Sequence, residues 1–230
     1  MDKLDKQSVW LVIAAYREEK SIANVVLELK KCGYQNVVVV DDGSKDRTFE
    51  VALEHTPHVL QHSINRGQGA ALKTGIDYAL LRGAEIIVTF DADGQHRVED
   101  LPAMIKPVAN GETDITLGSR FLGSSTNLPF MRRIFLKGGA LVIWLMYGVK
   151  LTDSHNGFRA MSSNAAEVID LKSDRMEHAS EFIDEIKRKH LRYKEIPVVI
   201  RYTDYSKARG QSNWNAFRIL YKMLLHRLLR

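Results

Sequence analysis

Two aspartates, one residue apart, are the clearest chemical signal in the sequence. Asp91 and Asp93 stand in FDADGQH, directly after an apolar run. In extended backbone, side chains two residues apart point the same way, so both carboxylates can face one cation while Ala92 leaves room for a ligand. Gln95 could supply a third oxygen, and oxygen ligands alone select Mg²⁺ or Mn²⁺. The alternative is an Asp-rich turn that caps a helix, but the position after a buried strand favours a metal site.

A second pair of carboxylates follows another apolar run. In VVVVDDGSKDRT, Asp41 and Asp42 precede Gly43 and Ser44. An ordinary turn explains the glycine and the serine. It does not explain two consecutive carboxylates, so we expect one of them to accept hydrogen bonds from ribose hydroxyls or a base N–H.

Closely spaced glycines precede a helical pattern in NRGQGAALKTG. Gly67 and Gly69 would let the backbone approach a nucleotide, and a helix amino terminus nearby favours phosphate. A plain turn into the helix is an equally good interpretation. The spacing matches neither a dinucleotide-binding fingerprint nor a P-loop.

These motifs need a scaffold that brings them together. Short apolar runs alternate with helical patterns over the first half of the chain, which predicts a Rossmann-like α/β fold with a mostly parallel sheet flanked by helices. We predict strands at 9–15, 36–44, 58–63, 85–94 and 114–121, and helices at 21–31, 46–55 and 68–82, with Ser21 capping the first helix. In such sheets ligands bind beyond the carboxyl ends of the strands, where both aspartate pairs stand.

The pattern changes after residue 120. Helices are predicted at 132–147 and 176–190, a strand within 193–202, and a basic amphipathic helix at 214–230. The last helix carries a stripe of leucines and aromatic residues edged by bases. Such a stripe is typical of a helix at a membrane surface. It could instead dock on a small membrane protein subunit or a second copy of the chain, and packing on the domain core is the alternative.

Length and composition fit one globular domain, or one domain with a short appendage. Apolar residues make up 45% and charged residues 27%, and the net charge of +5 is concentrated near the carboxyl terminus. The single cysteine, Cys32, indicates a reducing compartment, and no histidine stands in a zinc-binding pattern. No signal peptide is visible, and no apolar run reaches the roughly 20 residues of a membrane-spanning helix. We therefore expect a cytoplasmic protein, peripheral at the cytoplasmic face of the membrane.

The order of the motifs AAYREE, DDGSKDRT, NRGQGAAL, FDADGQH, GSRF and DSHNGFRA resembles that of family-2 glycosyltransferases with the GT-A fold. Within that family it is most similar to polyprenyl-phosphate sugar synthases of the dolichol-phosphate-mannose-synthase type. The resemblance covers about residues 9–212. It implies a GT-A catalytic domain over 1–212, followed by the amphipathic helix within 213–230.

The resemblance also implies roles for individual residues. The metal that holds the diphosphate would be bound by Asp91, Asp93 and Gln95. The nucleotide sugar would lie among a larger set of residues: Ala15, Tyr16, Glu18, Asp42, Gly69, Asp91 and Ala92.

On the acceptor side, the resemblance implies that Arg120 binds a phosphate together with Arg132 or Arg133. Surface salt bridging is the alternative for each arginine. Asp153 in DSHNGFR would lie close to the reacting centre, which makes Asp93, Asp153 and Arg120 the catalytic candidates. DSHNGF departs from the usual Pro/Ser-Gly-Phe run, and KARGQS only approximates the usual tail.

The expected reaction is metal-dependent, inverting transfer of a sugar from a UDP- or GDP-sugar to an undecaprenyl or dolichyl phosphate. A family-2 enzyme that elongates a cell-surface saccharide at a hydroxyl is the first alternative, and it would need a carboxylate base. A nucleotidyltransferase should carry a Gly-rich loop with Arg or Lys near its start, and AAYREE is not such a loop. A non-enzymatic nucleotide-binding module would leave the DxD without a purpose. Nucleic acid is not an expected partner.

Overall fold

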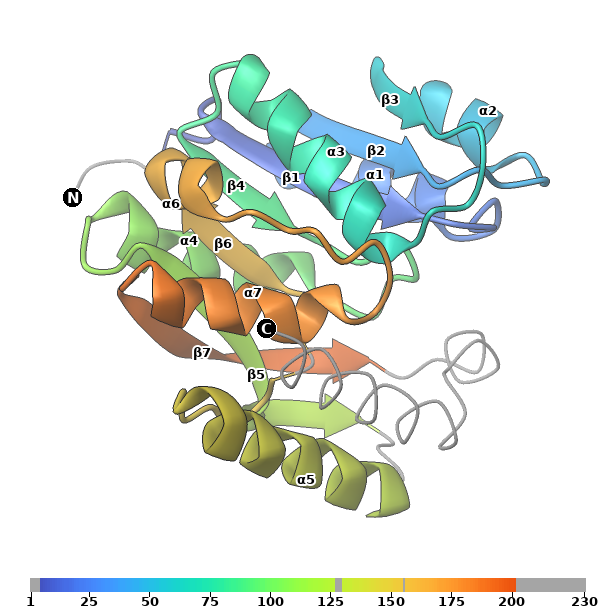
Figure 1. Ribbon diagram of the computed structural model, residues 1–230. Helices are drawn as coiled ribbons and strands as arrows, with labels where there is room; N and C mark the ends of the chain where they lie inside the picture. The colour runs from blue at the N-terminus through green and yellow to red at the C-terminus, as the bar shows by residue number, and fades with distance from the viewer. Residues whose placement is uncertain (1–4, 127–129, 155, 202–230) are drawn as a thin grey trace.

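The computed structural model describes residues 5–126, 130–154 and 156–201. Within these ranges seven strands form one mixed sheet in the order β3, β2, β1, β4, β6, β5, β7 (Figure 1). The strands are β1 (Val9–Ala15), β2 (Asn36–Asp41), β3 (His58–Gln61), β4 (Ile86–Thr89), β5 (Ile115–Thr126), β6 (Arg159–Ser162) and β7 (Tyr193–Arg201).

Most neighbouring strands in the sheet run parallel. The four strands β3, β2, β1 and β4 are parallel to one another, as are β5 and β7. The short strand β6 lies between these groups and is antiparallel to both β4 and β5. The predicted mostly parallel sheet is confirmed, and β6 is an addition that the sequence analysis did not predict.

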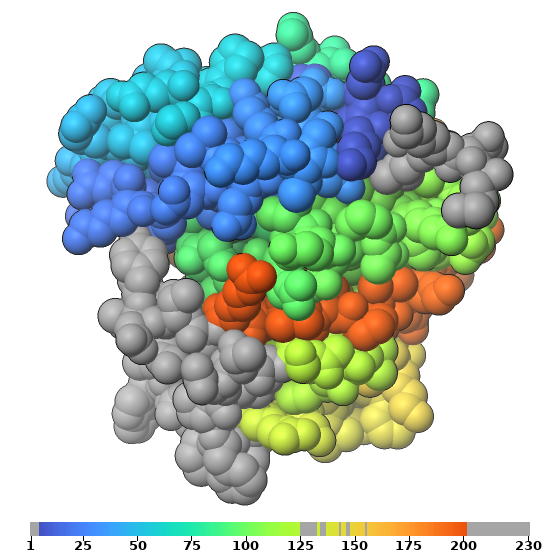
Figure 2. Space-filling view, turned by 180° about the vertical axis from the view of Figure 1, so that it is seen from behind, coloured from blue at the N-terminus to red at the C-terminus, as the bar shows by residue number. Residues whose placement is uncertain are grey.

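Helices cover both faces of the sheet. One face packs against α1 (Ile22–Lys31), α2 (Thr48–Leu53) and α4 (Leu101–Ala109), which follows the 3₁₀ turn η1 (Val98–Asp100). The other face packs against α3 (Gln68–Leu81), α6 (Ser163–Val168) and α7 (His178–Arg188). The helix α5 (Phe130–Tyr147) contacts α7 (Figure 1). Seen from behind, the surface of β7 forms an orange band between green α4 and the region of β5 and α5 (Figure 2).

The apolar runs are continuous because the central strands are buried on both sides. In β1, Leu11 and Ile13 face the core under α1 and α4, while Trp10 and Val12 face the core under α3 and α7. Alternate side chains of a strand point to opposite faces, so such a strand must be apolar throughout.

Two local predictions were wrong. The Ser21 side chain makes no capping hydrogen bond to α1; its hydroxyl instead donates to the carboxylate of Glu18. The strand predicted at 85–94 ends at Thr89, so Asp91 and Asp93 lie in a turn beyond β4 rather than in extended backbone. Gly94, with φ of +73°, follows in that turn.

Residues 202–230, which include the whole of the predicted amphipathic helix and the boundary near residue 212, lie outside the described residues. The division into a catalytic domain and a terminal helix therefore stays a prediction.

Candidate active site

The two halves of the chain meet at the carboxyl ends of the parallel strands. Because β6 is antiparallel, its first residue, Arg159, pairs with Thr89 at the end of β4 and with Leu117 in β5. The loop before β6 therefore lies at the same edge of the sheet as the loop after β4. The residues that follow Leu117 extend beyond the same edge, which brings Arg120 toward the DxD turn.

Both carboxylates of the DDGS turn accept hydrogen bonds from neighbouring segments of the chain. Asp41 accepts hydrogen bonds from Ser44 N at 3.1 Å and from Gln61 Nε2 at 2.9 Å. Asp42 is only 2% exposed and is bonded to His62 Nδ1 at 2.8 Å, and it accepts from Arg66 N at 3.0 Å and Gly67 N at 2.7 Å. These bonds fix the loop at 62–67. The expected contact of Asp42 with the nucleoside stays a prediction.

The AAYREE segment is tied to the same turn. Ala15 O accepts from Asp42 N at 2.8 Å, and Arg17 N donates to Ser44 Oγ at 2.8 Å with φ of 57° at Arg17. Glu18 N donates to the Thr48 hydroxyl at 2.8 Å.

Ala15, Glu18 and Asp42, three of the residues expected around the nucleotide, therefore lie together at one edge of the sheet. Tyr16 is 36% exposed there, and the Arg17 guanidinium carbon lies 5.3 Å from the centroid of its ring.

The glycines of NRGQG allow close packing within the chain. A Cβ atom on Gly67 would lie 2.4 Å from Asp174 O, and one on Gly69 would lie 2.1 Å from Ser173 O. Ala70 N, in the first turn of α3, donates to Asp174 O at 3.0 Å. The start of α3 is thus occupied by the segment that leads into α7. The contact with a nucleotide expected for Gly69 stays a prediction.

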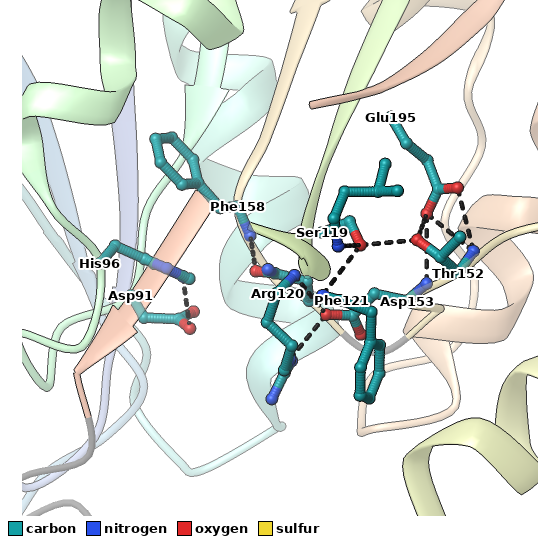
Figure 3. Close-up of polar contacts among 11 residues, drawn as sticks. Asp91, His96, Ser119, Arg120, Phe121, Thr152, Asp153, Phe158 and Glu195 are labelled. Atoms are coloured by element: carbon teal, nitrogen blue, oxygen red, sulfur yellow. Dashed lines mark hydrogen bonds and ion pairs between the residues drawn. The ribbon is translucent and has the colours of Figure 1, made fainter. Parts of the chain in front are cut away.

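Asp91 is surrounded by positive charge. His96 Nε2 lies 2.8 Å from Asp91 Oδ2 (Figure 3). The buried imidazole packs against Phe90 and Phe158. Burial acts to raise the pKa of Asp91, but the charges of His96, Arg120 and Arg159 outweigh it and hold the pKa below its usual range. Asp91 is therefore ionised at neutral pH.

Asp93 has the opposite environment. Burial, together with the negative charge of Asp91, raises the pKa of Asp93 to about 6. Gln95 N donates to Asp93 Oδ1 at 3.0 Å, and the Gln95 side-chain amide bonds to the other oxygen. Gln95 O in turn accepts from Arg201 N at 2.9 Å, which ties the turn to β7.

Two carboxylates that repel one another, with a carboxamide beside them, fit a hard divalent cation. Within residues 5–126, 130–154 and 156–201, no three His, Cys, Asp or Glu side chains form a metal-binding group. A cation at Asp91, Asp93 and Gln95 would thus need further oxygen ligands from water or a bound phosphate.

Arg120 and Asp153, both expected near the reacting centre, form one buried ion pair. Arg120 Nε lies 2.6 Å from Asp153 Oδ2, and the backbone N of Arg120 donates to the same oxygen at 3.1 Å (Figure 3). The side chains are 8% and 0% exposed. Arg133 is exposed on α5, and the side chain of Arg132 lies outside the described part of the structure, so their contact with a phosphate stays a prediction.

A hydrogen-bond network from β7 holds this pair in place. Glu195 accepts from Thr152 N at 2.9 Å, from the Thr152 hydroxyl at 2.8 Å and from Asp153 N at 3.1 Å (Figure 3). Since the Thr152 hydroxyl donates to Glu195, the Ser119 hydroxyl must donate to Thr152, at 2.6 Å. Ser119 Oγ also accepts from the backbone N of Phe121 and Leu122, where β5 shifts register against β7.

Sequence reasoning missed Glu195, Thr152, His96 and Arg159. A charged residue at the start of the otherwise apolar run EIPVVI was the available signal for Glu195. His96 stood in the FDADGQH motif itself, but its spacing gave no sign that it folds back onto Asp91.

Comparisons with known proteins agree with this architecture. The model of the family "Glycosyl transferase family 2" matches residues 10–170. The chain is 43% identical to an uncharacterized protein of Methanocaldococcus jannaschii, over 99% of this chain and 96% of that protein. It is 35% identical to the UDP-N-acetylglucosamine–dolichyl-phosphate N-acetylglucosaminyltransferase of Methanococcus voltae, over 94% of this chain and 95% of that one.

A third relative is the dolichol-phosphate mannosyltransferase of Pyrococcus furiosus, 30% identical over 94% of this chain and 63% of that protein. Among solved structures, glucosyl-3-phosphoglycerate synthase from Mycobacterium tuberculosis, in complex with Mn²⁺, UDP-glucose and phosphoglyceric acid, aligns with a TM-score of 0.73 at 16% identity. The alignment covers 94% of this chain and 78% of that one. This likeness concerns the fold, and it confirms the predicted GT-A architecture.

The histidine at the start of α7 should make stability depend on pH. Burial, helped by the charge of Arg159, lowers the pKa of His178 to about 4, and its Nδ1 lies 2.7 Å from Arg175 O. In the unfolded chain His178 is protonated as pH falls below about 6.5, whereas in the folded chain it stays neutral down to about pH 4. The contribution of neutral His178 to the free energy of unfolding is therefore fully present above pH 6.5 and is lost as pH falls toward 4. The loss should reach about 3 kcal/mol.

Urea unfolding of the wild type and of His178→Asn at pH 7.5, 6.0 and 5.0 measures this effect. Carboxylates titrate in both proteins, so the difference in unfolding free energy between them isolates the histidine. A difference that stays constant over the three pH values would contradict the prediction.

Proposed function

Because the chain belongs to glycosyl transferase family 2, we propose that this glycosyltransferase moves a sugar from a UDP- or GDP-sugar to a polyprenyl phosphate. The observation that carries the proposal is the meeting of two charged groups at one sheet edge. Asp91 and Asp93 form the acidic group, and the charge of Arg120, paired with Asp153, reaches Asp91. The name of the Methanococcus relative contains dolichyl phosphate and that of the Pyrococcus relative contains dolichol-phosphate, and both names support the same acceptor class.

The acidic group suits the donor end of the reaction. Asp91, Asp93 and Gln95 would hold Mg²⁺ or Mn²⁺, and the cation when bound would neutralise charge on the departing nucleoside diphosphate. The acceptor phosphate oxygen attacks the anomeric carbon as the bond from that carbon to the diphosphate oxygen breaks. A single displacement of this kind inverts the configuration at the anomeric carbon.

The geometry of Asp153 favours a phosphate acceptor over a hydroxyl acceptor. A hydroxyl must lose a proton to a positioned base, whereas a phosphate is already anionic near neutral pH. The Asp153 side chain is fully buried and accepts two hydrogen bonds from Arg120. We assign it the role of orienting Arg120, whose positive charge attracts the acceptor phosphate.

The surface of α5 supports contact with a lipid surface. In the described part of the chain, no helix is long and apolar enough to cross a bilayer. Three large apolar side chains of α5 are nevertheless exposed: Leu141 (52%), Trp144 (47%) and Leu145 (71%). Arg133 and Lys137, also exposed, lie one to three turns earlier on the same side of the helix. Cations beside an apolar stripe suit an interface with anionic lipid.

Incubation with a panel of labelled UDP- and GDP-sugars, Mn²⁺ and a short polyprenyl phosphate tests the reaction. We expect a labelled product that partitions into organic solvent.

Asp93→Asn should reduce the rate roughly 100-fold or more, because the charge that holds the cation is lost. Asp77→Asn, which removes a surface carboxylate paired with Lys73, is the matched control and should keep the rate. Full activity in excess EDTA would overturn the metal assignment.

The acceptor role of Arg120 has its own kinetic signature. Arg120→Lys keeps the charge but loses the fork that binds Asp153, so the KM for the polyprenyl phosphate should rise about 10-fold or more while donor affinity is unchanged. Glu195→Gln should move the same KM in the same direction, since it weakens the hold on Thr152 and Asp153. Glu112→Gln, at an exposed position, is the control. Loss of donor affinity in place of acceptor affinity would reverse the assignment.

Sedimentation with anionic vesicles tests the lipid contact. Replacing Leu141, Trp144 and Leu145 by Ser should release the chain from vesicles. The matched control replaces three other exposed apolar side chains by Ser: Leu53, Ile64 and Leu81. If the wild type stays in the supernatant at low salt, direct lipid contact is wrong, and a small membrane protein subunit or a second copy of the chain becomes the better partner.

A further inference from the structure

A buried arginine near the metal-binding carboxylates has no described acceptor for its hydrogen bonds. Arg159, the first residue of the central strand β6, is 4% exposed although it lies where β4 ends, at the carboxyl ends of the parallel strands. Its guanidinium carbon lies 4.1 Å from the centroid of the Phe182 ring on α7. Among the described residues its side chain makes no hydrogen bond and has no carboxylate oxygen within 4.0 Å. The guanidinium group carries five N–H donors, and the described residues offer them no acceptor.

Such an arrangement is costly for a folded protein. A buried guanidinium is normally paired with a carboxylate, because removing an ion from water costs several kcal/mol that only a close partner offsets. Burial lowers the pKa of Arg159 to about 10, which still leaves the side chain charged at neutral pH. The fold thus maintains a fixed positive charge in a place where the described structure does not neutralise it at contact distance.

The strand pairing brings this charge to the DxD turn. Thr89, two residues before Asp91, is the β4 partner of Arg159. Gly157, two residues before Arg159, lies so close to Asp91 that a Cβ atom would stand 2.8 Å from Asp91 Oδ1. The charges of Arg159 and Asp91 act on one another, while His96 contacts Asp91 directly.

We propose that Arg159 binds a phosphate oxygen of the nucleotide sugar's diphosphate. The inference rests on the proposed function, which supplies the diphosphate. A nucleoside diphosphate leaving group carries more negative charge than one divalent cation neutralises, and a preorganised guanidinium stabilises the remainder as the bond to the sugar breaks. The planar fork of arginine suits two phosphate oxygens. The acceptor phosphate offers the same oxygen chemistry, so the test includes both sources.

The proposal makes stability and binding change in opposite directions. Arg159→Met keeps most of the volume and removes the charge, and replacing a buried, poorly paired ion by an apolar side chain is neutral or stabilising. The melting temperature should therefore stay or rise, while affinity for a diphosphate falls. A purely structural arginine predicts the reverse: a lower melting temperature with affinity intact.

Calorimetry on the full chain decides between these roles. The probes are UDP, GDP and inorganic pyrophosphate, each with Mn²⁺, and the acceptor arm is the KM for a short polyprenyl phosphate. For Arg159→Met we expect affinity for the diphosphate probes to fall at least 10-fold and the acceptor KM to stay. Arg159→Lys, which keeps a charge, should retain part of the affinity. Arg192→Met, which removes an exposed pair with Asp114, is the control.

Each outcome has a defined meaning. A raised acceptor KM with unchanged diphosphate affinity overturns the proposal and assigns Arg159 to the acceptor. Unchanged affinity and KM with a lower melting temperature makes the residue structural. If the wild type binds UDP, GDP or pyrophosphate and Arg159→Met binds it equally well, only the assignment of Arg159 fails. If the wild type binds none of the three, the proposed function fails with it.

Discussion

The backbone hydrogen bonds that β6 makes with β4 and β5 determine where the two halves of the chain meet. A strand inserted antiparallel between parallel neighbours starts where β4 ends, so the loop before β6 lies beside the DxD turn. That loop carries Asp153 and Gly157, and Arg159 follows it as the first residue of β6. Had β6 run parallel, the same residues would stand at the opposite edge of the sheet, about 13 Å away for a four-residue strand.

The pairing also creates two different electrostatic environments within one short motif. Asp91 is surrounded by cationic groups and has a lowered pKa. The pKa of Asp93 is raised, mainly by burial and by the negative charge of Asp91. The ionised form of Asp91 is therefore stabilised by the protein itself. The ionised form of Asp93 would be stabilised by a bound cation. A sugar diphosphate with its metal would complete the balance of charge at the site, which is why removing one protein cation should affect binding more than folding.

Much of this could be predicted from the sequence, for physical reasons. The continuous apolar runs of β1 and β2 predicted buried parallel strands, and the carboxylates after β2 and β4 had to share one sheet edge. The strand β6 was missed because RAMS has four residues, too few for a period, and begins with a charged residue. The helix α4 was missed as well, although Leu101, Met104, Ile105 and Val108 form its buried face; it contains Pro107.

Other features depend on contacts between distant segments. Gly67 and Gly69 face the backbone of residues 173–174, and Glu195 bonds to Thr152 across 43 positions. Glycine spacing near a helix start is typical of nucleotide contact and of close chain packing alike, so only the fold separates the two. The same holds for Arg159: that its side chain has no carboxylate oxygen within 4.0 Å among the described residues becomes visible only when its neighbours from β4, β5 and α7 are known.

The place of β6 in the sheet also has a consequence for synthesis on the ribosome. The strands β1 to β4 can pair as soon as they emerge, but the free edge of β4 must wait for residues 159–162, about 70 residues later in the chain. The next strand to emerge, β5, pairs with β6 and β7, both of which follow it. A nascent chain of this protein therefore carries an open, apolar strand edge through the translation of α4, β5 and α5. An edge of that kind can pair with other chains, which makes this interval the one in which the growing protein most needs protection from aggregation.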